Sequence, residues 1–211
     1  LRLSDKEWMP KCNATYKTNI KFEGWSDADF FYPFGDLTGD DVSDFFILTH
    51  LFPDIKFNQF SRFHRYHSRF AELNRFTDNG WDFHDLTAYH FDTEKLAEVF
   101  YDVCLRNGVE FVDDKYIRAN KSNDGNITSL KCENGTHEAD LFVDCTGFHS
   151  ELLGKVMGVH YNSYADTLIN HRAIAAKIPY TDKNKQLTSY TNNVTMNNGW
   201  CYEIPLWDGM S

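Results

Sequence analysis

The order of elements between residues 92 and 147 constrains the fold of this chain more than any other feature. Apolar residues recur at three- and four-residue steps through residues 92–108, which predicts an amphipathic helix. Asp92 can cap the first turn because its carboxylate can accept backbone N–H groups there. Gly108 suits the left-handed residue that commonly ends a helix.

A run of strands is predicted after this helix. Val109–Val112 and Tyr116–Ala119 are rich in strand-forming residues, and Ile127–Cys132 returns after a turn at residues 123–126. Ala139–Cys145 contains a short unbroken apolar run, which is typical of a strand buried on both faces of a parallel sheet. The order of helix, hairpin and buried strand predicts an α/β (α+β mixed) fold.

The predicted buried strand runs directly into a small-residue turn. Thr146 and Gly147 follow Asp144-Cys145, and a glycine lacks the Cβ that would keep a ligand away from the backbone. A generic αβ segment that ends in a glycine turn is the alternative interpretation of this stretch.

Residues 26–60 are predicted to be loop-like, because Asp and Gly alternate with aromatic residues there and Pro33 and Pro53 interrupt longer elements. Phe60, Phe63, His64 and His67 then follow a helical spacing. Two histidines three residues apart could ligate a metal, but no Cys or carboxylate completes a set, so no metal site is expected.

Composition excludes several classes of function. The net charge of −10 argues against a nucleic-acid partner, which needs a basic surface. There is no run of 18 apolar residues and no basic leader followed by an apolar stretch, so neither a membrane span nor a secretory signal is expected. The five cysteines are an odd number and are scattered without C-x-x-C spacing, which fits reduced thiols in the cytoplasm better than a disulfide framework or a zinc site.

Several short motifs occur in a fixed order along the chain. They are Trp8-Met9-Pro10, Tyr16-Lys17, Ile20-Lys21-Phe22, Tyr32-Pro33-Phe34-Gly35, His90-Phe91-Asp92, Asp140 to Phe148, and Gly199-Trp200-Cys201-Tyr202-Glu203-Ile204-Pro205. Together they resemble the flavin-dependent halogenases, and the tryptophan halogenases in particular, along the whole chain. The resemblance implies an FAD-binding two-domain monooxygenase/halogenase-like fold.

The glycine fingerprint G-x-G-x-x-G that binds the FAD pyrophosphate does not occur in the sequence. We therefore expect residues 1–211 to be an internal part of one flavin-dependent halogenase domain, incomplete at both ends. The family's catalytic glutamate is expected downstream of residue 211, and the isolated polypeptide is not expected to be catalytically active.

The resemblance also implies an activity and a set of partners. FAD, reduced by a separate flavin reductase, would react with O₂ and a halide such as chloride to make hypohalous acid. The acid would travel to Lys17, which would act either as an ammonium donor or as a haloamine. An electron-rich aromatic substrate, in the setting of natural product biosynthesis, would then be halogenated.

Further residues take roles from the same resemblance. Trp200 and Tyr202 would wall the tunnel between flavin and substrate, with Tyr202 replacing a second tryptophan. Phe34 would contact the substrate, whereas Pro33 replaces a histidine that clamps free tryptophan, so an indole or a phenol is the expected arene. The resemblance also implies that Asp144, Thr146 and Gly147 bind the cofactor.

Other interpretations remain open at the level of sequence. An FAD-dependent aromatic monooxygenase of the same fold would not need Lys17 or the Trp200 motif. A binding module derived from the fold would lack the chemistry altogether, and Lys17 would then be a lysine on a strand edge whose charge reaches solvent. A homo-oligomer is compatible with the sequence.

Overall fold

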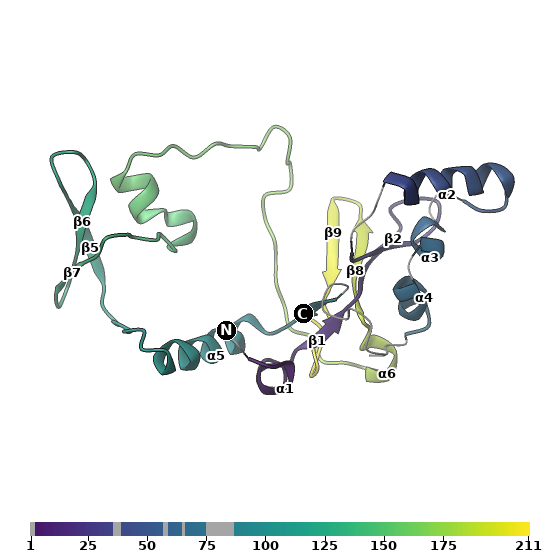
Figure 1. The fold of residues 1–211 in the computed structure, drawn as a ribbon, viewed down its shortest axis with the longest axis horizontal. Helices are drawn as coiled ribbons and strands as arrows, with labels where there is room; N and C mark the ends of the chain where they lie inside the picture. Colours follow the sequence, from purple (N-terminus) through teal and green to yellow (C-terminus); the bar gives the residue numbers. More distant parts are fainter. Residues whose placement is uncertain (1–2, 36–38, 57–58, 65, 75–86) are drawn as a thin grey trace. The chain divides into compact units, whose positions relative to one another are not determined.

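The computed structural model describes residues 3–35, 39–56, 59–64, 66–74 and 87–211 (Figure 1). The chain forms two compact units, and each is described by itself. The first consists of residues 1–106 and 173–211, and the second consists of residues 107–172.

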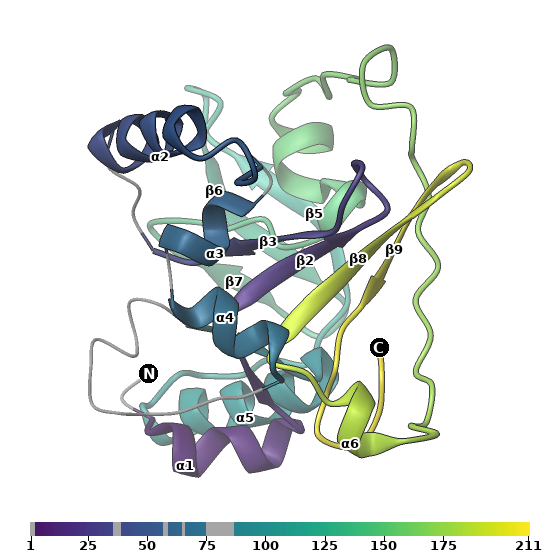
Figure 2. The same cartoon turned by 90° about the vertical axis from the view of Figure 1, so that its right-hand side faces the viewer.

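A four-stranded mixed sheet dominates the first unit, with the strand order β3-β2-β8-β9 (Figure 2). Its strands are β2 (Asn19–Glu23), β3 (Phe30–Pro33), β8 (Tyr190–Met196) and β9 (Gly199–Glu203). β2 pairs antiparallel with β3 and parallel with β8, and β8 and β9 form an antiparallel hairpin. Pro33 is tolerated because β3 lies at the edge of the sheet, where a missing N–H leaves no ladder bond unmade.

Two short helices, α3 (Phe60–His64) and α4 (Tyr66–Glu72), pack against β2 and β3 (Figure 2). The buried Ser68 hydroxyl in α4 donates a 3.1 Å hydrogen bond to the Asn19 side chain of β2. The predicted helical spacing at Phe60–His64 is therefore confirmed. The side chains of His64 and His67 lie outside what the structure describes, so the absence of a histidine metal site stays a prediction.

The loop prediction for residues 26–60 is wrong, because this stretch contains β3 and the helix α2 (Gly39–Leu51). Phe45 of α2 is buried, and its ring lies 5.0 Å from that of Phe60, measured between centroids. Burial of such aromatic side chains stabilises a helix whose local composition suggests a loop.

A smaller two-stranded sheet pairs β1 (Thr15–Lys17) antiparallel with β4 (Ala88–His90). A short helix α1 (Asp5–Trp8) and a 3₁₀ turn η1 (Met9–Cys12) lead into β1. A hydrophobic cluster packs beside them and comprises Cys12, Ala14 and Val99 with Leu3, Trp8, Met9, Phe91 and Leu96. This cluster fixes β1 against the long helix that follows β4.

That long helix, α5 (Thr93–Arg106), confirms the clearest sequence prediction. The Asp92 carboxylate accepts hydrogen bonds from the N–H groups of Glu94 at 3.1 Å and Lys95 at 3.4 Å, as a cap requires. It also pairs with Lys177 Nζ at 2.7 Å, and this contact contributes most to holding the Asp92 pKa below its usual value. Gly108 has φ +78°, as predicted for the residue after the helix.

Replacing Asp92 by alanine is expected to lower the free energy of unfolding by about 1–2 kcal/mol, because the first-turn N–H groups lose their acceptor. Chemical denaturation of the complete protein measures this change. Alanine in place of the exposed Glu98 on the same helix is the matched control and is expected to change stability by less than about 0.5 kcal/mol. Equal effects of the two substitutions would contradict a capping role.

The second unit carries a three-stranded antiparallel sheet of β5 (Tyr116–Lys121), β6 (Ile127–Cys132) and β7 (Thr136–Glu138). The hairpin predicted around residues 123–126 is therefore confirmed. A 3₁₀ turn η3 (Gly147–His149) and a wider π-type helical turn η4 (Glu151–Val156) follow.

Two strand predictions in this unit are wrong. Val109–Val112 forms no strand in the described chain, and its apolar side chains are exposed. Ala139–Cys145 forms no strand there either, with Leu141 78% and Val143 74% exposed. A strand needs a neighbour for its backbone hydrogen bonds, and no described segment lies beside either stretch in a ladder.

No helix in the described ranges combines the length and the apolar character needed to cross a bilayer.

Candidate active site

Lys17 ends β1 at the point where the chain passes from the small sheet into the large one. It pairs with Ala88 of β4, and the next residue, Thr18, donates its N–H to Ser189 O at 2.8 Å just before β8. The Lys17 ammonium lies 5.5 Å from the centre of the Phe34 ring. The structure therefore places two of the candidate site residues, Lys17 and Phe34, beside each other.

The surroundings of Lys17 differ from those of the other lysine nearby, Lys21. Burial lowers the pKa of Lys17, and no carboxylate among the described residues forms an ion pair with it. Lys21 is also partly buried, but Glu23 at 2.7 Å and Asp29 at 3.2 Å outweigh that burial and raise its pKa. Lys17 alone of the two has an amine that is free of a fixed counter-ion.

A buried histidine, His90, connects β1 with β8 next to this lysine. Its Nδ1 lies 3.2 Å from the Thr15 hydroxyl and its Nε2 lies 2.8 Å from the Thr191 hydroxyl. The Thr15 hydroxyl in turn donates to Pro205 O at 2.7 Å. A continuous hydrogen-bond network therefore links residues near the start of the polypeptide with residues near its end.

The Pro205 carbonyl at the end of this network determines which group donates in each hydrogen bond. A carbonyl can only accept, so the single Thr15 hydroxyl hydrogen is used on Pro205 and His90 Nδ1 must donate to Thr15. His90 Nε2 is then an acceptor for Thr191, and the ring is neutral. Burial first, and the charge of Lys17 second, lower the pKa of His90 to about 3. Sequence reasoning placed His90 in a motif but gave it no role.

Trp200 and Tyr202 lie on β9, with Trp200 near the hairpin turn that joins it to β8. Trp200 pairs with Thr195, and its ring lies 6.1 Å from Trp25 and 6.2 Å from Tyr202. At about 3.3 Å per residue, the six positions from Ser189 to Thr195 separate Trp200 from the level of Lys17 by about 20 Å along the strand. The structure therefore does not place Trp200 beside Lys17, and the role of Trp200 and Tyr202 in a tunnel wall stays a prediction.

The turn predicted to meet the cofactor lies in the second unit and is held by Asp144. One carboxylate oxygen accepts from the Thr146 hydroxyl at 2.6 Å and from its N–H at 3.1 Å. The other accepts from the N–H groups of Leu152 at 2.9 Å and Leu153 at 2.8 Å. These bonds, with the Thr146 hydroxyl foremost, lower the pKa of Asp144 to about 2. Asp144 therefore shapes the turn with an ionised carboxylate.

Gly147 has an open approach. Its φ is +60°, and a Cβ built there would meet no atom within 4 Å. The backbone of this turn is accordingly uncovered on the glycine side, which fits close contact with a flat ligand such as a flavin.

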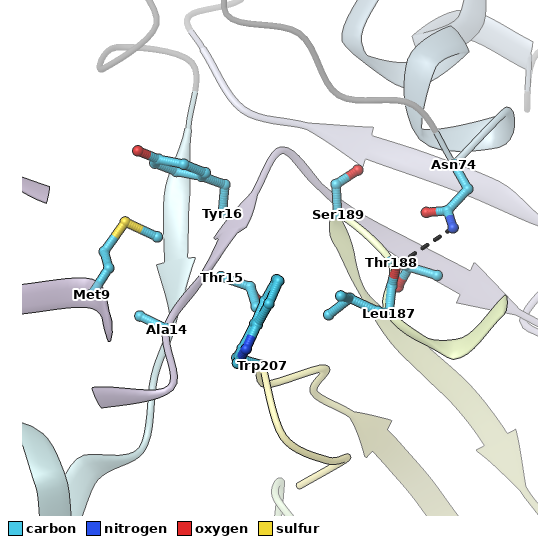
Figure 3. A pocket seen from close by; sticks show the side chains of 9 residues that line it. All are labelled: Met9, Ala14, Thr15, Tyr16, Asn74, Leu187, Thr188, Ser189 and Trp207. Carbon is cyan, nitrogen blue, oxygen red and sulfur yellow. Dashed lines mark hydrogen bonds between the residues drawn. The ribbon is translucent and has the colours of Figure 1, made fainter. Parts of the chain in front are cut away.

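A separate pocket of about 350 Å³ lies beside β1 (Figure 3). It is lined by Met9, Ala14, Thr15, Tyr16, Asn74, Leu187, Thr188, Ser189 and Trp207. None of these residues carries an acid or base suited to catalysis near neutral pH, and neither Lys17 nor Phe34 lines the pocket. It is therefore distinct from the predicted site.

The mixed sheet and its lysine site have the fold of flavin-dependent halogenases. The structure named "VirX1 apo structure" matches 99% of this chain and 44% of its own, with a TM-score of 0.90 and 33% identity. The crystal structure of the tryptophan 6-halogenase SttH from Streptomyces toxytricini matches 99% of this chain and 43% of its own, with a TM-score of 0.87 and 31% identity.

The chain belongs to the tryptophan halogenase family, whose model matches residues 1–211. The 7-chloro-L-tryptophan 6-halogenase KtzR of Kutzneria sp. (strain 744) is 31% identical over 98% of this chain and 45% of its own length. The chain thus spans less than half the length of these curated and solved relatives.

Proposed function

We propose that the protein is an FAD-dependent halogenase that transfers an electrophilic halogen from hypohalous acid to an electron-rich aromatic substrate. The observation that supports this most directly is Lys17, which is partly buried, lacks a carboxylate partner in the described chain, and lies 5.5 Å from the Phe34 ring. A lysine that only bound a neighbouring acid would resemble Lys21 instead.

Lys17 would act on the hypohalous acid as a positioned cation. Its ammonium can donate a hydrogen bond to the hypohalous oxygen, which draws electrons from the halogen and makes it more electrophilic. The Phe34 ring face stabilises this charged form. In the alternative route, the neutral amine would attack the halogen. An N–X bond would form, the O–X bond would break, and water would leave with the amine proton.

Bound FAD, once reduced, would supply with O₂ and halide the hypohalous acid that Lys17 receives. Thr146 and Gly147 are proposed to approach the flavin, since the glycine backbone is open there and Asp144 holds the turn in shape. Trp200 and Tyr202 are proposed to wall the path between flavin and Lys17. A separate flavin reductase and a cytoplasmic location complete the proposal.

The substrate is proposed to be an indole or a phenol. Relatives such as KtzR and SttH carry names that give tryptophan or chlorotryptophan as their substrate. In this chain Phe34 is present beside Lys17, but Pro33 occupies the preceding position, where a proline has neither an aromatic ring nor a donor. Recognition of a free amino acid is therefore not part of the proposal.

The test uses the complete protein with FAD, a flavin reductase, NADH, a chloride or bromide salt, and a panel of indoles and phenols. Halogenated arene, identified by the isotope pattern in mass spectrometry, is expected only when halide and reductase are both present. Hydroxylated product without incorporated halogen would instead support a monooxygenase. Absence of any arene product across the panel would contradict both enzymatic readings.

A further inference from the structure

Three side chains of the second unit that have no part in the proposed function converge on one point. They are Asp114, Cys132 and His137, and their potential ligand atoms all lie within 4.8 Å of one another. Cys132 ends β6, His137 is the central residue of β7, and Asp114 lies two residues before β5. Two strands, β6 and β7, and the segment that leads into β5 therefore contribute to one cluster.

The register of the sheet explains the convergence. His137 is directly opposite Leu130, so the two side chains share one face of the sheet, and Cys132 shares it because it lies two residues further along β6. Tyr116 pairs with Cys132, and Asp114 precedes Tyr116 by two positions. No recognised ligand spacing links residues 114, 132 and 137, so the sequence predicted no metal here.

The Asp114 carboxylate is fixed and ionised. Its side chain is only 5% exposed, and it accepts hydrogen bonds from Lys115 N at 2.8 Å and from the N–H and side-chain amide of Asn134 at 3.1–3.2 Å. Burial, the largest single influence, acts to raise the pKa of Asp114, but these bonds together lower it. A negative charge is thus held beside β6 and β7.

His137 presents a nitrogen that the fold leaves unused. Its Nε2 atom is buried and has no hydrogen-bond partner among the described residues, and it lies 3.8 Å from Asp114 Oδ2, too far for a hydrogen bond. The buried Cys132 thiol is free as well. A buried polar atom without a partner is unfavourable, and a cation between these groups would satisfy it.

We propose that Asp114, Cys132 and His137 bind a divalent ion of the zinc type. A thiol, an imidazole and a carboxylate are the donors that Zn²⁺ takes, whereas Mg²⁺ and Ca²⁺ prefer oxygen donors alone. Three protein ligands leave the fourth tetrahedral position to water or another small ligand. On binding, the Cys132 S–H bond breaks, a sulfur–metal bond forms, and the proton leaves to solvent.

The spacing of the donors suits this ion after a small movement. Metal–donor distances of about 2.0–2.3 Å place tetrahedral donors about 3.5 Å apart. Here the His137 and Asp114 donors are 3.8 Å apart, and no pair of donors is more than 4.8 Å apart. The His137 side chain is 42% exposed, so its ring can shift toward Asp114 and Cys132 without disturbing a packed core. The bound ion would join β6 and β7 to the segment that leads into β5.

Cobalt(II) is the probe, because its bond to a thiolate gives an absorption band. Neither bound zinc nor cobalt free in solvent gives this band. The complete protein, reduced and stripped of metal, is expected to bind one Co²⁺ with a thiolate-to-cobalt band, which added Zn²⁺ abolishes. Cys132→Ser is expected to remove the band. Cys145→Ser, which alters an exposed thiol of the same unit, is the matched control and is expected to keep it.

A second pair of variants covers the case in which Cys132→Ser does not fold. His137→Ala is expected to weaken Co²⁺ binding at least about tenfold, in line with the loss of a metal ligand, while His160→Ala, at an exposed histidine of the same unit, leaves it unchanged. The proposal is overturned by a missing thiolate band, by a band that persists in Cys132→Ser, or by equal affinity in the two histidine variants.

Discussion

Replacing Lys17 by alanine in the complete protein is expected to lower kcat for halogenation by about 10²–10³-fold, as the loss of a positioned electrostatic group does in other enzymes. Reduced flavin and hypohalous acid would still form, so NADH consumption by the reductase continues while halogenated arene disappears. Product measured per NADH consumed, by chromatography with mass spectrometry, separates these two effects.

Lys21→Ala provides the matched control for this substitution. Lys21 lies four residues further along, in the adjoining strand, but its amine is paired with Glu23 and Asp29. Halogenation is expected to be little changed in this variant. A similar loss in both variants, or an unchanged product yield in Lys17→Ala, would remove Lys17 from the mechanism.

The pH dependence of kcat distinguishes the two chemical roles of Lys17. With the ammonium as hydrogen-bond donor, the rate is expected to fall as pH rises through the pKa of Lys17, which burial lowers from its usual value. A rate that increases through the same range would instead indicate a neutral amine that forms an N–X bond. Both profiles disappear in Lys17→Ala.

Replacing His90 by glutamine is expected to change both the stability and its dependence on pH. At pH 7 the free energy of unfolding is expected to fall by about 1–3 kcal/mol, because the hydroxyls of half-buried Thr15 and buried Thr191 lose their hydrogen bonds to the imidazole ring. Halogenation is expected to fall with it, since His90 ties the strand that carries Lys17 to β8.

The acid side of the stability curve identifies His90 itself. Its folded pKa of about 3 lies below the unfolded value of 6.5, so the unfolded chain binds the proton first as pH falls. The contribution of neutral His90 to the free energy of unfolding is fully present above pH 6.5 and is lost as the pH falls toward 3. Over this range the free energy of unfolding changes by up to about 1.4 kcal/mol per pH unit. Denaturation at several pH values in this range gives the free energy of unfolding as a function of pH, and this plot is expected to be flatter by that amount in His90→Gln.

Thr191→Val supplies the control for the pH experiment. It removes the hydroxyl that donates to His90 Nε2 but leaves the imidazole in place. Stability at pH 7 is expected to fall, while the slope between pH 6.5 and pH 3 persists. An equally flat curve in this variant would show that the slope does not come from His90.

Local patterns predicted the elements whose stability is local. The helix after Asp92 was predictable because its cap, its apolar face and Gly108 agree, and β6 was predictable because a turn precedes a strand-forming run. Ala139–Cys145 has an equally clear apolar run, yet strand formation depends on a partner that the sequence pattern cannot supply. For the same reason α2, which is stabilised by the packing of Phe45, was not predictable from its composition.

The candidate site likewise combines features that the sequence predicted and features that only the fold reveals. Lys17 and Phe34 were singled out separately from family motifs, and the structure places the Lys17 ammonium 5.5 Å from the centre of the Phe34 ring. The bridging role of His90 could not be predicted, because it depends on hydroxyls that come from β1 and β8. Likewise, the 20 Å or so between Trp200 and Lys17 follows from strand direction and register, which a list of motifs does not contain.

The parallel pairing of β2 with β8 has a consequence for how the protein is made. Thr18 and its partner Ser189 are 171 residues apart, so the strand bearing Lys17 emerges from the ribosome long before the strand that anchors it. At about 5–20 residues per second, that interval lasts roughly 10–35 s. Lys17 can therefore reach its final surroundings only late in synthesis, and contacts of such high sequence separation form slowly.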